Sequence, residues 1–496
     1  MPTDRRNFIK FVVAGSVAAG CPVDLALLAA PEPPRPAVDG EHNEICHEVR
    51  DGHQFARPAA SAKHDIVIVG GGMSGLSAAY YLRDQDFLLL EKEDHWGGNA
   101  YLEEYLGQAY ATGTAYTNAN TVAFDLCKEI GITPLPIDCP DSLILHREFV
   151  PHAWRDGIGH LPYPKAVRQS FAKFKQEMLK VDLVSRAAEL DAQPLTDFLK
   201  GYAPELKAWW DNYGPSNWGA TAADTSALVG LGDFQDFAGN KPDDRMTFPG
   251  GLGAISKKLA EVLLASHADR MLGGATIVAV EQGKRDVTVT YVHQGQVQGV
   301  TAKAVIMAAP KFIARRIVAG LPAAQKEAMG KIRYAPYPVV NVIFDKPVFN
   351  KVYDNWCPGG NAFTDFIVAD WVVRNQPGYV QKNNILTFYT PLPEAQRAVL
   401  LTEDGARQVA ANVLRDFQKL MPAFNVEPVE VHIYRRGHPM FMATPNNFTK
   451  VIPAARQPME RVFFANTDST GPVSMTTGAI DASKRAIEEM KKALAG

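Results

Sequence analysis

Alternating blocks of apolar and polar residues in the first quarter of the chain predict a strand, a turn, a helix and a second strand. The run Asp65–Val69 is short and rich in β-branched residues, which is typical of a buried parallel strand. A glycine-rich turn follows at residues 70–75, and Leu76–Arg83 has a helical pattern with small residues on one face. Phe87–Leu90 is a second buried run, with Glu91 at its end. This order predicts a β-α-β unit.

The glycine turn has the spacing G-x-G-x-x-G. The first glycine allows a tight turn, the second lets a pyrophosphate approach the backbone, and the third lets the helix pack closely on the strand. The helix N-terminus offers free N–H groups to phosphates, and an acidic residue about 20 residues on can accept hydrogen bonds from a ribose. We therefore predict a dinucleotide site. Its residues in this unit are Gly70, Gly72, Met73, Ser74, Gly75, Glu91 and Lys92.

A second glycine pair, Gly97-Gly98-Asn99, follows the second strand. This arrangement resembles the flavin-containing amine oxidoreductase superfamily, which includes monoamine and polyamine oxidases, protoporphyrinogen oxidase and phytoene desaturase-like enzymes. The residue after the pair is usually arginine in that superfamily and is Asn99 here. The resemblance favours FAD over NAD. It also implies an α/β fold in which a Rossmann-like FAD-binding domain is interleaved with an α+β substrate domain.

The resemblance implies further cofactor contacts in later parts of the chain. Gly113, Thr114 and Ala115 would lie beside the flavin ring, and Met271 would hold the adenine through its backbone. Asp468 would hydrogen-bond the ribityl chain. The N-terminus of the last helix, with Thr477 and Ala479, would face the N1 and C2 edge of the flavin, where a positive dipole end stabilises the anionic reduced ring.

Changes in pattern along the chain suggest where the two domains alternate. Lys165–Val181 and Leu195–Asn212 predict helices of a separate region, Thr402–Met421 predicts an amphipathic helix, and Pro338–Phe349 predicts a strand. We assign residues 64–142, 245–325 and 455–496 to the FAD-binding domain and residues 143–244 and 326–454 to the substrate-binding domain.

The N-terminus resembles a twin-arginine export signal. Asp4–Lys10 contains two arginines followed by Phe, Ile and Lys, and the apolar run Phe11–Gly20 is too short and too rich in Gly and Ala to span a bilayer. We expect a signal peptide over residues 1–30, a linker over residues 31–63, and a periplasmic or exported protein. Lipid attachment at Cys21 is a less favoured alternative to cleavage near residues 28–30.

Composition excludes several function classes. The net charge is −3 and no basic block interleaves with aromatic residues, so we expect no nucleic-acid partner. The five cysteines lack the spacing of haem or zinc sites, so we expect no metal. Cys127 and Cys139 are a candidate disulfide pair in an oxidising compartment. No cysteine precedes Met475 in the closing loop, so we expect FAD to be bound non-covalently.

Three positions are candidates for catalytic roles, and two of them depart from the superfamily. The lysine that commonly holds a water near flavin N5 is Asn341 in our alignment. The aromatic residue before the last helix is Met475, which cannot form a ring cage. Tyr434 or Phe441 could supply the second aromatic ring, and His438 is a candidate acid or base.

Three functions are compatible with these departures. We favour an FAD-dependent oxidase or dehydrogenase that takes a hydride from an amine or polyamine, because chemistry on a neutral amine requires little from side chains. The alternatives are a desaturase or double-bond isomerase acting on an apolar substrate, and a flavin-binding electron-transfer protein. The sequence leaves open whether O2 or a periplasmic acceptor reoxidises the flavin, and which oligomeric state the protein adopts.

Overall fold

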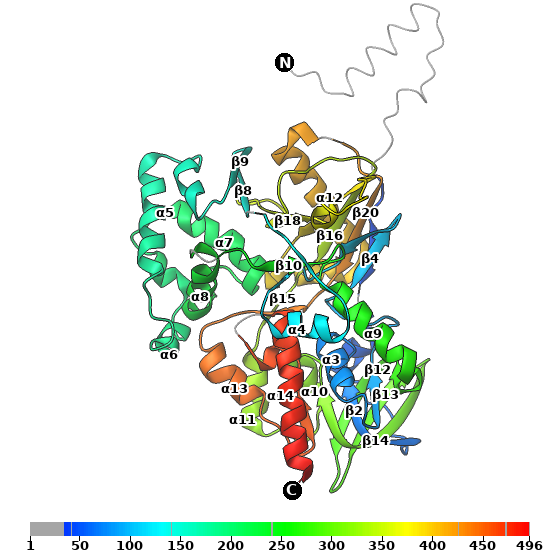
Figure 1. The fold of residues 1–496 in the computed structure, drawn as a ribbon. Helices are drawn as coiled ribbons and strands as arrows, with labels where there is room; N and C mark the ends of the chain where they lie inside the picture. Colours follow the sequence, from blue (N-terminus) through cyan, green and yellow to red (C-terminus); the bar gives the residue numbers. More distant parts are fainter. Residues whose placement is uncertain are drawn as a thin grey trace, which may run out of the picture.

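The computed structural model describes residues 34–40, 42–139, 141–239, 242–424, 426–471 and 474–495. These residues form two large sheets with separate cores, one above the other in Figure 1, and a group of helices at one side. The chain enters each sheet several times, so both sheets are discontinuous in sequence. The expected mixed α/β architecture with interleaved halves is confirmed.

The first sheet is built around β2 (Ala62–Val69), which pairs in parallel with β3 on one side and β14 on the other. Successive side chains of β2 fill two different cores, since Ile66 and Ile68 face one layer and Val67 and Val69 face the other. The other strands of this sheet are β3 (Phe87–Leu90), β11 (Met271–Leu272), β12 (Ala275–Gln282), β13 (Val287–His293), β14 (Gln296–Met307) and β22 (Val462–Phe464).

Helices cover both faces of this first sheet (Figure 1). On one face, α3 packs between α14 and α9, which lie far apart in the sequence. The glycines and alanines of α3 allow this close packing. The helices of this half are α3 (Met73–Tyr81), α4 (Val122–Glu129), α9 (Gly253–His267), α10 (Lys311–Ile317), α11 (Ala323–Lys331), α13 (Ile452–Ala455) and α14 (Thr476–Ala495).

The second sheet has eight strands in the order β1-β20-β16-β19-β18-β17-β8-β9. One face packs on the amphipathic helix α12 (Glu403–Leu420), whose buried residues include Val409, Val413 and Phe417. The opposite face borders the cavity described below. The strand bounds are β1 (Ala37–Gly40), β8 (Ser142–Leu145), β9 (Glu148–Pro151), β16 (Val339–Phe344), β17 (Asp354–Trp356), β18 (Asp365–Val368), β19 (Asn384–Tyr389) and β20 (Glu430–Arg435).

The helices at the side of the molecule are α5 (Lys165–Met178), α6 (Ala187–Asp191), α7 (Pro204–Trp218) and α8 (Ala227–Ala238). They enclose an aromatic core centred on Trp210 and Phe234. The helix expected over Leu195–Asn212 is instead a short turn followed by α7. Gly201 adopts a positive φ of 82°, and Pro204 begins the new helix, where its fixed φ and missing N–H are favourable.

Three small sheets connect the larger units. A three-stranded sheet contains β6 (Thr117–Asn118), β7 (Leu135–Pro136) and β10 (Arg245–Thr247). The other two are antiparallel pairs, the hairpin of β4 (Leu102–Tyr105) with β5 (Gln108–Ala111), and β15 (Tyr334–Ala335) with the sequence-distant β21 (Met440–Phe441).

The segment expected to be a linker contains regular structure. β1 pairs in parallel with β20 at the edge of the second sheet, whereas α2 (Glu44–Arg50) contacts β12 of the first sheet. Between them, the His42 backbone N–H and Nδ1 reach the two carboxylate oxygens of Glu93 at 2.9 and 2.6 Å. This segment therefore joins the two halves of the molecule.

Other sequence expectations have a plain structural outcome. Cys127 is a free thiol, so it does not form the candidate disulfide with Cys139. Within the described ranges, every helix is too short or too polar to cross a bilayer. The twin-arginine pattern and Cys21 lie outside the described residues.

Candidate functional site

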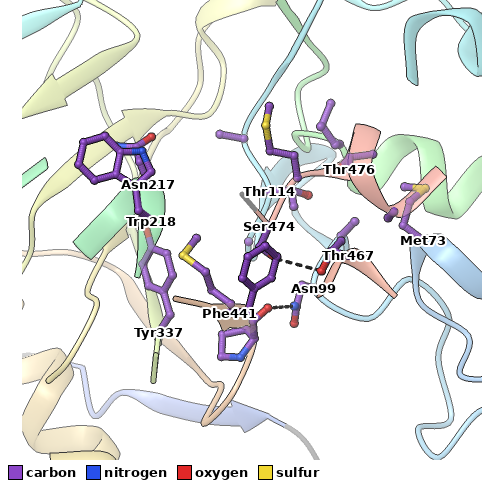
Figure 2. Close-up of a pocket in the computed structure, with 18 of the residues that line it drawn as sticks. Met73, Asn99, Thr114, Asn217, Trp218, Tyr337, Phe441, Thr467, Ser474 and Thr476 are labelled. Atoms are coloured by element: carbon purple, nitrogen blue, oxygen red, sulfur yellow. Dashed lines mark hydrogen bonds between the residues drawn. The ribbon is translucent and has the colours of Figure 1, made fainter. Parts of the chain in front are cut away.

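A single large cavity of about 2290 Å³ runs between the two sheets and the side helices. Ligand cavities for one drug-sized molecule are usually about 300–1,000 Å³, so this volume has room for a dinucleotide and a further small molecule. One end borders the glycine loops of the first sheet, and the other borders the second sheet and α7 and α8. Figure 2 shows the middle of this cavity, with Thr114 and Thr476 on one side and Trp218 and Tyr337 on the other.

The first glycine turn has the geometry that the sequence predicts. Gly70 adopts a φ of 103°, and α3 begins directly after Gly72. A Cβ atom at Gly75 would lie 1.7 Å from the carbonyl oxygen of Gly70, so only glycine fits at this contact between helix and strand. Gly70, Gly72, Met73 and Ser74 line the cavity. The N-terminus of α3 therefore faces the open space, as an anion-binding turn requires.

The second glycine pair lies directly against the first turn. Gly72 and Gly97 form an isolated β-bridge, and the N–H of Gly97 donates to the carbonyl of Gly71 at 2.9 Å. A Cβ at Gly98 would stand 3.1 Å from the Cα of Gly72. Two backbone segments without side chains thus form one wall, with Lys92 and Asn99 also on the cavity. This wall fits the diphosphate of a dinucleotide.

Glu91 supports this wall. Its carboxylate accepts hydrogen bonds from the backbone N–H groups of Gly71 and Glu93, and its side chain is buried at the cavity edge. Burial raises the pKa of the Glu91 carboxyl, although Lys92 and the two N–H donors oppose this shift. Glu91 therefore holds the glycine turn as well as bordering the ribose end of the predicted site.

At the flavin end, the loop Gly113–Ala115 meets the start of α14. The hydroxyls of Thr114 and Thr476 are buried, line the cavity and have no hydrogen-bond partner among the described residues. Buried hydroxyls normally find a partner, so these two oxygens are open to a polar ligand. Ala479 also lines the cavity, whereas Thr477 does not, because the helical turn directs it away from this wall. These residues fit the polar edge of a flavin.

Arg436 belongs to the same wall and was not identified from the sequence. Its guanidinium donates to the carbonyls of Thr112 and Asn99 at 2.6 and 3.2 Å, and to the Thr112 hydroxyl at 2.9 Å. Asn99 in turn donates from Nδ2 to the carbonyl of Pro439 at 2.8 Å. One sequence signal could have identified Arg436. Arg435 and Arg436 come shortly before His438, and Asn99 replaces the arginine that usually follows the second glycine pair.

Besides Gly75 and Thr477, two further expected cofactor contacts, Met271 and Asp468, are not on the cavity. Met271 is buried in the core, and its backbone pairs with Leu89 of β3. Thr276 and Ile277 of β12 line the cavity instead. Asp468 is fully buried, and its carboxylate accepts hydrogen bonds from the Lys311 N–H and Nζ and from the Tyr334 hydroxyl. Its neighbour Thr467 lines the cavity.

Asn341 is also separated from the cavity, which corrects its expected position. It is fully buried within β16, and its Oδ1 accepts a hydrogen bond from the Thr387 hydroxyl at 2.6 Å. Val339, two residues earlier on the same strand face, lines the cavity. The residue of β16 that lines the cavity is therefore the apolar Val339.

Met475 and His438 do lie on the cavity. Met475 is 38% exposed, and the His438 ring lies 4.6 Å from the ring of Phe312. Burial and the nearby Arg397 lower the pKa of His438 to about 4. His438 is therefore neutral at ordinary pH and is a poor source of a proton there.

The N-terminal segment supplies part of the wall that the sequence analysis did not anticipate. Residues from β1 and α2 line the cavity near the glycine loops. Because β1 is an edge strand and α2 is short, neither has a strong local pattern. The lining residues of this segment are Asp39, Gly40, Asn43, Cys46, His47 and Arg50.

Comparisons with known proteins agree with this geometry. The chain is 24% identical over 504 residues to the oxidoreductase PigB of Serratia sp. (strain ATCC 39006), covering 84% of this chain and 73% of that protein. It is 22% identical over 479 residues to human flavin-containing amine oxidase B, covering 88% and 87%. The structure of cyclohexylamine oxidase from Brevibacterium oxydans IH-35A superimposes with a TM-score of 0.69 at 17% identity, covering 87% of this chain and all of that one.

A family model describes most of the chain. The model of the flavin containing amine oxidoreductases matches residues 73–490, which include helix α3, the second glycine loop, the second sheet apart from β1, and most of the final helix. FAD as cofactor and oxidoreductase as enzyme class are thereby confirmed. The protein belongs to the flavin-containing amine oxidoreductase family.

Proposed function

We propose that this FAD-dependent oxidoreductase oxidises an amine that enters the cavity between the second sheet and the helices α7 and α8. The observation that carries the proposal is the composition of this end of the cavity, where aromatic rings alternate with the carboxyl groups of Asp233, Asp354 and Asp365, the last two of them buried. Acidic groups attract a cationic amine, whereas their desolvation opposes binding of a purely apolar substrate. The lining favours the amine over the desaturase or isomerase alternative.

The residues that would hold FAD lie on one continuous wall. Non-covalent binding is part of the proposal, because neither cysteine of the cavity wall, Cys46 or Cys139, lies on the loops 113–115 or 474–479. The proposed contacts are Gly70, Gly72, Met73, Ser74, Glu91, Lys92, Gly97, Gly98, Asn99, Gly113, Thr114, Ala115, Thr276, Ile277, Thr476 and Ala479.

When bound, FAD supplies the two-electron oxidant that accepts a hydride from the carbon next to the amine nitrogen. The protein's own residues position the substrate and exclude water. Tyr337 is fixed by a 2.6 Å hydrogen bond between its hydroxyl and that of Ser216, and Phe441 and Trp218 border the same space. With an apolar Val339 and a neutral His438 on the wall, the chemistry depends on binding the amine in its neutral form at the reacting end.

The test is anaerobic titration of the purified protein with amines while the visible flavin spectrum is recorded. Bleaching of the flavin band by an amine supports the proposal, and subsequent oxygen admission shows whether O2 is an acceptor. A flavin band that no amine bleaches, but that an unsaturated apolar substrate does, would favour the alternative. Acid precipitation distinguishes the attachment, because non-covalent FAD is released to the supernatant.

Export through the twin-arginine pathway is part of this proposal. The support is the sequence around Arg5 and Arg6, together with a pathway that carries folded proteins and so suits a cofactor bound before export. Replacing both arginines by lysine is expected to retain a folded reporter, fused to residues 1–63, in the cytoplasm. Export of the double variant at the normal level would contradict it.

A further inference from the structure

Two aspartates project from neighbouring strands onto the far wall of the cavity. Asp354 lies on β17 and Asp365 on β18, and these strands pair antiparallel with Asp354 opposite Ile367 and Trp356 opposite Asp365. The two carboxyl groups are therefore diagonal neighbours on one sheet face. Both side chains line the cavity, and they are only 4% and 3% exposed.

One carboxyl oxygen of this pair lacks a hydrogen-bond partner within the described part of the chain. Oδ1 of Asp354 is buried and has no partner among the described residues, whereas Oδ1 of Asp365 accepts a hydrogen bond from the Thr364 hydroxyl at 2.6 Å. Neither aspartate forms an ion pair within the described part of the chain. Buried carboxyl groups of native proteins are normally paired or fully hydrogen-bonded. The open oxygen of Asp354 thus points to a ligand.

The nearest cation cannot fill this role. The Arg245 guanidinium influences Asp354 electrostatically, but it is bonded to Asp141, to Asp243 at 2.7 Å and to the carbonyl of Cys139 at 3.0 Å. These contacts occupy its guanidinium with Asp141, Asp243 and the carbonyl of Cys139. No cation among the described residues is therefore bonded to either carboxyl group of the pair.

Aromatic rings surround the same position. Trp209 and Tyr213 of α7 stack on each other at 5.5 Å, and Trp356 lies 4.5 Å from Tyr213, measured between ring centroids. All three line the cavity. The faces of aromatic rings attract cations, and the effect grows when water is excluded. Acidic and aromatic groups together favour an alkylammonium ion over a metal ion or a neutral group.

The register of the second sheet gives the separation between this position and the cofactor end. Asp365 is opposite Tyr389, and Tyr389 is opposite Val339. Asp365 is thus two strand spacings, or about 10 Å, from Val339. The Tyr389 hydroxyl donates to the carbonyl of Gly113 at 2.8 Å, which places Tyr389 between the acidic pair and the loop 113–115.

We propose that Asp354 and Asp365 bind a second cationic group of the substrate, so that the preferred substrate is a linear diamine or polyamine. This inference rests on the proposed function. One nitrogen, neutral, occupies the reacting end beside the cofactor wall, and the other, as an ammonium ion, lies between the two carboxyl groups and the rings of Trp209 and Trp356.

The test compares α,ω-diamines with monoalkylamines of equal chain length, from about three to eight carbons, in wild type and in the variants Asp354→Asn and Asp365→Asn. Asp404→Asn is the matched control, because this side chain is 92% exposed on α12. Dissociation constants come from anaerobic flavin reduction. We expect wild type to bind the best diamine about 10- to 100-fold more tightly than the monoamine, as is typical of charge pairs with low solvent exposure.

Each asparagine variant is expected to lose most of this preference for the diamine, because its diamine constant weakens much more than its monoamine constant. Equal affinity for diamine and monoamine in wild type, or a preference that persists in both variants, would overturn the inference. If no amine reduces the flavin, the proposed function fails separately. Calorimetric titration with hexane-1,6-diamine then still tests the acidic pair, because binding that is lost in both variants supports it and absence of binding refutes it. Flavin content and near-ultraviolet circular dichroism check that each variant is folded.

Discussion

Lys311 and Asp468 form an ion pair in which both side chains are completely buried, with 2.7 Å between Nζ and Oδ1. The pair lies just behind the cavity wall, because Ala309 and Pro310 precede Lys311, and Thr467 precedes Asp468. Burial lowers the pKa of Lys311, while Asp468 favours its charged form. The pair therefore joins the start of α10 to the turn after β22.

Removing one partner of this pair should destabilise the protein strongly. Lys311→Met leaves the Asp468 carboxylate buried without its cation, and we expect a loss of about 3–5 kcal/mol in the free energy of unfolding. Denaturant unfolding of the purified variants measures this change. Lys491→Met is the control, since its exposed pair with Glu488 should contribute no more than about 1 kcal/mol. Equal effects of the two substitutions would show that the buried pair has no special role.

Gly75 should tolerate no side chain. The Cβ of Gly75→Ala would stand 1.7 Å from the Gly70 carbonyl oxygen, so α3 must move away from β2. We expect a loss of at least about 3 kcal/mol and a protein purified without flavin, measured by unfolding and by the ratio of absorbance at 450 and 280 nm. Gly159→Ala is the control, because nothing lies within 4 Å of its added Cβ. Normal flavin content in Gly75→Ala would contradict the close-packing argument.

The glycine loops could be predicted from the sequence because their chemistry is local. Only glycine accepts the φ of 103° at Gly70 or the contact at Gly75, so the residue type itself records the backbone geometry. The same applies to the order of strand, turn and helix, which follows from short apolar runs. These features required no knowledge of distant parts of the chain.

The residues of the second sheet that line the cavity were harder to predict from the sequence than the glycine loops. The candidate at Asn341 shares a strand face with Val339, but a shift of two residues moves a side chain about 6.8 Å along the strand and out of the cavity. Arg436 and the α2 segment reach the site through contacts that span more than 200 residues or lack local periodicity. Such positions depend on tertiary packing rather than on sequence pattern.

The contact between His42 and Glu93 should make docking of the N-terminal segment depend on pH. The hydrogen bond with Glu93 raises the pKa of His42, and Glu44 adds to this shift while burial and Lys92 oppose it. Because the folded pKa is raised, the stabilisation is fully present below the usual histidine pKa and is lost as the pH rises through the folded value. His42 is 70% exposed, so the effect should be modest, about 1 kcal/mol or less.

Hydrogen exchange of residues 37–50, followed by mass spectrometry, measures this docking. In the wild-type protein, the amide hydrogens of this segment should exchange a few-fold faster when the pH rises from 6 to 9, after correction for the intrinsic exchange rates. His42→Gln should exchange faster at pH 6 and show little further change. His95→Gln is the control, because His95 pairs with the exposed Asp94. A segment whose corrected exchange is independent of pH in wild type would contradict the role of this contact.

The acidic pair should make diamine binding improve with pH. Burial raises the pKa of both carboxyl groups, that of Asp365 to about 7, and the charge of Asp365 raises the pKa of Asp354 further. An arriving ammonium ion must displace this proton, so the dissociation constant of a diamine should fall as the pH rises from 6 to 8, while the second nitrogen keeps its charge. Hydrogen bonds from Thr364 and Ser216 lower the pKa of Asp365. The other charged groups that act on this pair are Asp141, which raises both pKa values, and Arg245, which lowers that of Asp354. A diamine constant with the same pH dependence as the monoamine constant would argue against the pair.

His438 should not act as the acid or base of the reaction despite its place on the cavity. Its pKa of about 4, lowered by burial and then by Arg397, means that the ring is neutral from pH 5 upward and undergoes no protonation change across the working range. His438→Gln keeps a polar side chain of similar size beside Phe312, so the pH profile of flavin reduction between pH 5 and 9 should keep its shape, with a rate within about tenfold of wild type. A histidine that served as general base would contribute 10²–10⁴-fold to the rate, and its removal would delete the acidic limb of the profile. Rapid-mixing measurements of flavin reduction at each pH separate these outcomes, because a changed shape requires a titrating His438, whereas a uniform small decrease requires only a role in packing.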